Sequence, residues 1–108
     1  MARYDLMVRR GETVRRVLRL KKGGEAMDLT GWSGKAQIRP EPDSAELVCE
    51  MELTIVPEEG KVVMIIPLSV TAGISSGVYS WDIRLTDDEG IARYYAGGAV
   101  KVMPTVTK

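Results

Sequence analysis

The sequence of 108 residues contains no histidine, no phenylalanine and a single cysteine, Cys49. Histidine is the commonest general base and the commonest metal ligand of proteins, so its absence removes every Ser-His or Cys-His nucleophile pair. One cysteine excludes an internal disulfide and a multi-cysteine zinc site. We therefore expect a protein that is not an enzyme, with no catalytic residue, no metal and no cofactor, and whose stability comes from apolar burial.

Long apolar runs are missing as well. No run approaches the roughly 20 residues that a membrane helix needs, and residues 1–5 lack the apolar stretch of a signal peptide. We expect no membrane partner and a chain that stays in the cytoplasm unless a larger particle carries it out. The length suits one domain, residues 1–108, with residues 104–108 as an extended tail.

Charge is balanced overall but uneven along the chain. The 15 basic and 15 acidic side chains give a net charge of zero. Residues 1–22 carry a net charge of +6 and the remainder carries −6. A basic segment of this kind can meet the acidic part of a neighbouring copy in a head-to-tail contact, so we expect a homo-oligomer.

The clearest local pattern is the alternation of apolar and polar residues in the segment 78–86. This period of two is typical of a half-buried strand. The turn residues 87–90 and the apolar segment 91–96 follow, which together predict a β-hairpin. Residues 68–74 have the spacing of one short helical turn.

Comparable strand patterns recur along the chain, separated by turns that contain glycine or proline. Residues 12–22 also fit a helical period, so a helix remains an alternative there. Seven to eight short strands with such turns predict an all-β, antiparallel β-sandwich, with a small barrel as the alternative. The expected strands are residues 3–10, 13–20, 32–39, 47–55, 61–66, 78–86, 91–96 and 99–103.

The inward rows of these strands predict the core. Cys49 belongs to such a row, beside Glu50 and with no histidine available, so we interpret it as a buried structural thiol. The tryptophans are interpreted as core residues rather than as ligand-stacking ones. The predicted core comprises Trp32, Ile38, Cys49, Met51, Leu53, Tyr79, Trp81, Ile83 and Leu85.

Two groups of residues are candidates for an interface. One is a basic N-terminal edge, and the other belongs to residues 61–66, which read as a strand covered on both faces or lying at a subunit contact. The arginines could alternatively make the chain a small nucleic-acid-binding regulator. Aromatic residues are not interleaved with them apart from Tyr4, so we do not expect nucleic acid as a partner. The candidates are Arg9, Arg10, Arg15, Arg16, Arg19, Val63 and Ile65.

Four segments carry a family resemblance: residues 28–39 (DLTGWSGKAQIR), 60–62 (GKV), 67–74 (PLSVTAGI) and 77–87 (GVYSWDIRLTD). With them the chain resembles small immunoglobulin-like structural proteins of tailed bacteriophages and prophages, and it is similar to the N-terminal domain of phage baseplate upper proteins. The resemblance implies an immunoglobulin-like fold and a virion structural or accessory role in the tail, baseplate or neck. Its partners would be other phage structural proteins.

The same resemblance implies localisation in the virion, after assembly in the host cytoplasm. It carries over no catalytic residue. The sequence stops at Lys108, without the C-terminal part of the multidomain baseplate proteins, so the resemblance does not imply direct recognition of the host.

Overall fold

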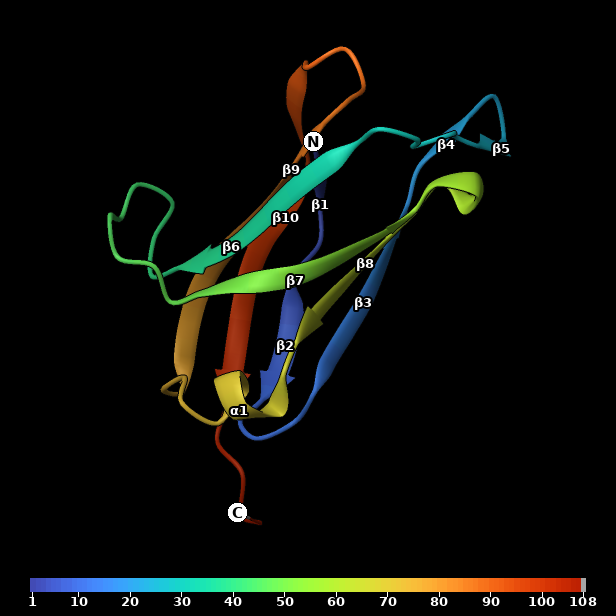
Figure 1. Ribbon diagram of the computed structural model, residues 1–108. Helices are drawn as coiled ribbons and strands as arrows, with labels where there is room; N and C mark the ends of the chain where they lie inside the picture. The colour runs from blue at the N-terminus through green and yellow to red at the C-terminus, as the bar shows by residue number, and fades with distance from the viewer. Residues whose placement is uncertain (108) are drawn as a thin grey trace.

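The computed structural model describes residues 1–107 and consists mostly of β-strands, which confirms the all-β prediction. Eight strands form one mixed sheet that curls until its two halves face each other (Figure 1). The strand order is β1-β10-β9-β6-β7-β8-β3, and β2 also pairs with β10. The strands of the sheet are β1 (Ala2–Arg3), β2 (Leu6–Arg9), β3 (Val14–Arg19), β6 (Ser33–Arg39), β7 (Cys49–Val56), β8 (Lys61–Ile66), β9 (Gly77–Thr86) and β10 (Ala92–Met103).

Three smaller elements complete the fold. A separate two-stranded hairpin is formed by β4 (Lys21–Lys22) and β5 (Glu25–Ala26), and a single 3-10 turn, η1 (Pro57–Glu59), joins β7 to β8. The helical turn expected within residues 68–74 is confirmed as α1 (Leu68–Thr71). Neither this turn nor η1 is a helix long and apolar enough to cross a membrane, and residues 1–107 contain no other helix.

The β9–β10 hairpin is the longest paired unit of the sheet and follows the predicted alternation. Its turn is held by Asp87, whose Oδ1 accepts hydrogen bonds from the amides of Glu89 and Ile91 at 2.9 and 3.0 Å. Gly90 adopts a φ of 84°, a conformation that other residues rarely take. The turn predicted at residues 87–90 therefore connects β9 to β10 in the structure.

Side chains from both halves of the curled sheet fill the space between them, and three of the predicted core residues are only partly buried. The first is Trp32, which precedes β6 and packs its ring against Tyr95 with centroids 6.0 Å apart. Tyr79 is also only partly buried, and its hydroxyl donates to the Ser75 carbonyl at 2.6 Å. Leu53 is the third exception and packs over Gly34, which has no side chain to cover it. The other predicted core residues are buried: Ile38, Cys49, Met51, Trp81, Ile83 and Leu85.

The N-terminal segment differs most from expectation. Residues 3–10 are not one strand, because the chain kinks at Tyr4 and Asp5 between β1 and β2. Both short strands pair with β10 in parallel, so the sheet is mixed and not purely antiparallel. The β10 strand is itself continuous through Gly97 and Gly98, where the sequence suggested a break.

Gly98 explains why the kink and the continuous strand occur together. A Cβ atom at Gly98 would lie 2.6 Å from the carbonyl oxygen of Tyr4 and from Oδ1 of Asp5. Glycine therefore lets the N-terminal backbone approach β10 closely. The Tyr4 amide donates to the Gly97 carbonyl at 2.9 Å, and Asp5 accepts from the Ala99 amide at the same distance.

Candidate functional site

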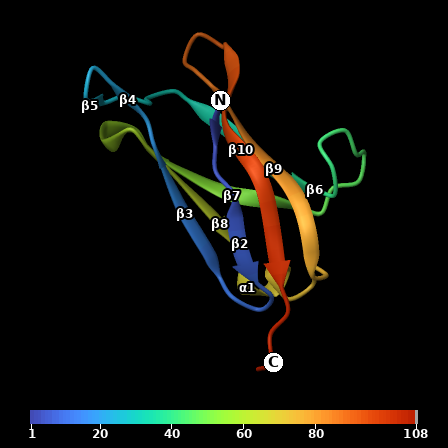
Figure 2. The same ribbon diagram turned by 180° about the vertical axis from the view of Figure 1, so that it is seen from behind.

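The two ends of the curled sheet face each other without pairing. Within residues 1–107, β2 pairs with β10 alone and β3 pairs with β8 alone, although β2 and β3 are joined by a short turn. Figures 1 and 2 show the two strands close together at that turn and diverging away from it. Each strand thus presents an edge of backbone groups that no neighbouring strand uses. We call the space between β2 and β3 the seam.

The seam contains a cavity of about 410 Å³ that both strands line. Its apolar lining comes from the buried side chains of Leu6, Leu18, Met64 and Trp81. Arg16 extends across it, and its Nη2 donates a hydrogen bond of 3.3 Å to the Met7 carbonyl on β2. A single side chain therefore bridges a gap that a strand ladder would otherwise close. The remaining lining residues are Tyr4, Asp5, Arg16, Val17 and Arg19.

The arginines of β3 lie on both faces of that strand. Arg15 pairs in register with Ile65 and Arg19 with Lys61, so both belong to the outward row, whereas Arg16 belongs to the inward row. Within residues 1–107 the ion pairs are Arg3–Asp5 and Lys61–Glu59, and neither involves an arginine of β3. The β3 edge therefore carries three positive charges that no acidic side chain of the described chain neutralises.

The other two arginines of the predicted basic edge lie elsewhere. Arg9 ends β2, and Arg10 lies in the turn before β3, where its Nη2 donates to the Ala72 carbonyl at 3.1 Å. The five arginines are therefore not brought to one common surface. A phosphate backbone needs several cations along one face, and Arg15 and Arg19 share the outward row of β3 whereas Arg16 belongs to the inward row.

The apolar strand β8 contributes less surface than expected. Val63 is only 7% exposed, because β8 lies between β3 and β7 and Val63 stands in register with Val17 and Thr54. Its side chain therefore offers little surface in the free chain, and its role at an interface stays a prediction. Ile65 is partly exposed in the same outward row and remains available.

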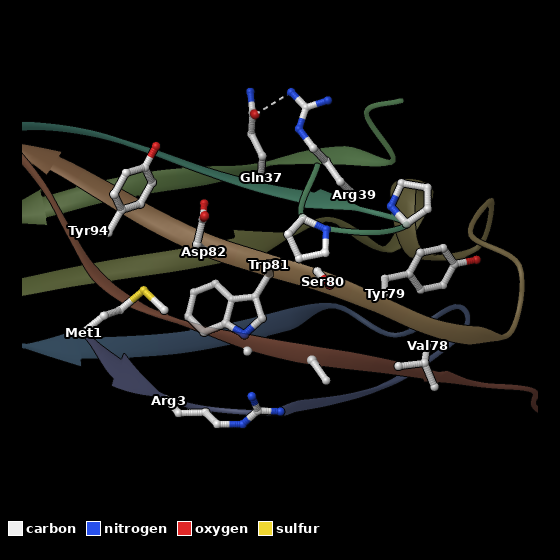
Figure 3. A pocket seen from close by; sticks show the side chains of 14 residues that line it. Met1, Arg3, Gln37, Arg39, Val78, Tyr79, Ser80, Trp81, Asp82 and Tyr94 are labelled. Atoms are coloured by element: carbon white, nitrogen blue, oxygen red, sulfur yellow. Dashed lines mark hydrogen bonds between the residues drawn. The ribbon is translucent and has the colours of Figure 1, made fainter. Parts of the chain in front are cut away.

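A second surface feature lies on the outer face of β6, β9 and β10 (Figure 3). It is an open groove of about 600 Å³, with Ser80 and Ala99 among its lining residues. Arg39 is fixed at one side, donating to Oε1 of Gln37 at 2.9 Å and to the Ala45 carbonyl at 3.1 Å. Exposed apolar side chains lie along the same groove, namely Met1, Val78 and Tyr94.

Few titratable groups have an altered environment. Burial raises the pKa of the Cys49 thiol, which disfavours the reactive thiolate. Hydrogen bonds from the hydroxyl and the amide of Thr30 lower the pKa of Asp28, in the turn before Trp32. Within residues 1–107 no group of three or more cysteine, aspartate or glutamate residues could hold a metal ion. The two groups with a shifted pKa therefore lie in the core, for Cys49, and in a turn, for Asp28.

The seam was not recognised from the sequence. Three of the arginines lie on β3, but the lining residues Tyr4 and Leu6 belong to the expected strand 3–10 and Met64 to the expected strand 61–66. Alternation shows which face of a strand is buried and does not show which edge is unpaired. The kink at Tyr4 and Asp5 leaves no local signal either, because both residues fit the alternation of one strand over residues 3–10.

Comparison with known proteins identifies similar folds. No protein-family model and no curated protein sequence matches this chain. The N-terminal domain of ORF48 of phage TP901-1 has a similar structure, with a TM-score of 0.55 and 10% identity over 94% of this chain and 98% of that one. CopC from Methylosinus trichosporium OB3b has a TM-score of 0.54 and 15% identity over 96% of this chain and 88% of that one. The chain thus shares its β-sandwich fold with a phage protein domain and with CopC.

Proposed function

We propose that this chain is a non-enzymatic structural or accessory component of a phage or prophage particle, in the tail, baseplate or neck, which acts through protein–protein assembly. The observation that carries the proposal is the structural similarity to the N-terminal domain of ORF48 of phage TP901-1. The match extends over 98% of that domain. The four sequence segments that resemble phage structural proteins point to the same fold.

Because CopC has a comparable fold, the surfaces must distinguish between possible roles. The features that stand out are an unpaired strand edge with three arginines and an open groove flanked by exposed apolar side chains. Unpaired edges and apolar patches are typical of protein docking surfaces. Cys49, the one cysteine, lies in the core and so does not contribute to either surface.

Charge placement supports assembly into a homo-oligomer. The acidic residues Glu41, Asp43 and Glu46 lie in the loop between β6 and β7, and Figures 1 and 2 place this loop on the side of the molecule away from β3. Opposite charges on opposite sides favour head-to-tail contact between copies. Light scattering at low and at high salt measures this directly: we expect an assembly that weakens as salt increases, and a monomer under all conditions would contradict the oligomer.

The role in a particle is tested by purifying particles from the phage or lysogen that encodes the chain. Particles are banded on a density gradient, washed in high salt and analysed by quantitative mass spectrometry. We expect the chain at a constant ratio to the major tail protein across the particle band, while an abundant host cytoplasmic protein is washed away. A chain that washes out with the host protein would overturn the proposal.

A further inference from the structure

We propose that the seam binds an extended segment of a partner protein in which acidic and apolar residues alternate, and that this segment adds to the sheet as a strand against β3. The inference rests on the proposed assembly function and names the chemistry of the partner. Three observations carry it: the unpaired edge of β3, the apolar cavity beside it and the charges of Arg15, Arg16 and Arg19.

The backbone of β3 supplies the first part of the argument. Within the described chain its ladder runs to β8 only, so no strand uses the backbone donors and acceptors of its other edge, where the Arg15 carbonyl accepts from Nη1 of Arg16 at 3.1 Å. Extended peptides commonly bind by adding to such an edge, where main-chain hydrogen bonds give affinity and alternate side chains give specificity. The two strands diverge away from their connecting turn (Figures 1 and 2), and a cavity of about 410 Å³ lies beside that edge.

The side chains of β3 determine which residues the added strand should carry. The inward row of the added strand would lie beside Leu18 and over Met64 and Trp81, so apolar side chains are required there. The outward row of the added strand would lie beside Arg15 and Arg19, so acidic side chains are favoured. An alternation of acidic and apolar residues satisfies both rows at once.

Arg16 also fits this arrangement. In the free chain its guanidinium donates to the Met7 carbonyl across the seam. A backbone amide of the incoming strand can take over that carbonyl, which frees the Arg16 guanidinium to leave the seam. The bridge therefore satisfies the Met7 carbonyl until a partner strand replaces it.

The same arginines oppose pairing between identical edges. If two copies met through β3, arginine side chains would face arginine side chains, and like charges directly opposite are destabilising. Charged residues on an edge strand are a known means of preventing such self-association. The charge of the edge thus selects an acidic partner strand over a second β3.

A synthetic peptide tests the inference with the whole chain. The probe has about seven residues, the length of a short strand, alternates glutamate with valine and is blocked at both ends. It is titrated into the whole chain at the lowest salt concentration at which light scattering finds a monomer, so that charges are screened as little as possible. We expect NMR amide shifts and slowed amide exchange in β3 and β2.

Two control peptides separate strand addition from simple charge attraction. One carries lysine in place of glutamate, and the other carries N-methyl groups at alternate residues on the edge that would bond to β3. We expect each change to weaken binding at least about tenfold. Equal binding of the N-methylated peptide would show that charge alone is recognised and would overturn the inference.

Paired variants of the protein locate the site. Arg15→Glu combined with Arg19→Glu should weaken peptide binding by about tenfold or more. The matched control, Lys35→Glu with Arg84→Glu, reverses two exposed charges on β6 and β9 and should leave binding within about twofold. Circular dichroism checks that both variants keep the fold.

Three results would overturn the inference: no binding at about 1 mM peptide, amide shifts confined to β6 and β9, or a stable dimer in which the seam amides are already protected by a second copy. Any of these would leave the role in a particle untouched if the chain remains in washed particles. A seam that binds the peptide, in a chain absent from particles, would instead overturn the proposed function alone.

Discussion

The indole Nε1 of Trp81 donates a hydrogen bond of 2.7 Å to the carbonyl oxygen of Tyr4, a residue 77 positions earlier in the chain. This bond fixes the kinked N-terminal segment against the β9–β10 hairpin. Trp81 and Tyr4 both line the cavity of the seam. The tryptophan that anchors the hairpin therefore also sets the position of the β2 side of the seam.

Replacing Trp81 by phenylalanine should be costly. The change removes the hydrogen bond to Tyr4 and leaves a void at a side chain that is only 4% exposed. We expect a loss of about 2–4 kcal/mol in the free energy of unfolding, measured by urea denaturation. Trp32→Phe is the matched control, since Trp32 is only partly buried, and should lose clearly less. Equal losses would show that the Trp81–Tyr4 bond has no special role.

Alanine at Gly98 should disturb the N-terminal crossing. Its Cβ would lie 2.6 Å from the Tyr4 carbonyl oxygen, a backbone atom that moves only with the strand. We expect a loss of about 1–3 kcal/mol, together with faster amide exchange in β2. Gly73→Ala is the control, because the nearest atom to its Cβ would be at 3.6 Å. If the two variants are equally stable, the close approach at Gly98 is not required.

The Cys49 thiol should react slowly in the folded chain. Burial raises its pKa above the ordinary value of 9.0, so the folded state holds the proton more tightly than the unfolded state does. The resulting stabilisation is complete below pH 9 and is lost as pH rises through the folded-state pKa. We expect the wild-type chain to lose stability relative to Cys49→Ala as pH increases above 9. Rapid labelling by a disulfide reagent at pH 8 in the native state would contradict this account.

The arginines should not give useful affinity for DNA. They are split between the two faces of β3, the end of β2 and the turn that precedes β3. We expect no shift of a DNA duplex in a gel assay at about 50 mM salt, where phosphate contacts are strong. A shift that disappears as salt increases, and that Arg15→Glu with Arg19→Glu abolishes, would instead favour the regulator hypothesis.

Local patterns in the sequence were sufficient to predict most strands. The period-two rows around Trp81 and Ile38 correspond to β9 and β6, and the chemistry of Asp87 and Gly90 marks the hairpin turn. These predictions succeed because one residue pattern determines one strand face. The segment 12–22, where a helix was the alternative, contains the strand β3 because its residues pair along β8.

Features that depend on distant contacts could not be predicted in this way. Gly98 falls between the expected strands 91–96 and 99–103, whereas in the structure it lies within β10 and lets Tyr4 approach closely. Val63 was expected at an interface, yet its neighbours in β3 and β7 bury it. The strands β1 and β2 each pair in parallel with β10, far away in the sequence, and this pairing leaves the seam between β2 and β3. A local pattern contains no information about that.

The most direct test of the account is electron microscopy of purified particles in which this chain carries a peptide tag, detected with gold-labelled antibody. The account predicts gold at one fixed position along the tail, baseplate or neck of each particle. Untagged particles, prepared in parallel, should remain unlabelled. Gold that is absent from tagged particles, or scattered without a preferred position, would contradict the claim that this β-sandwich is a structural component of the particle.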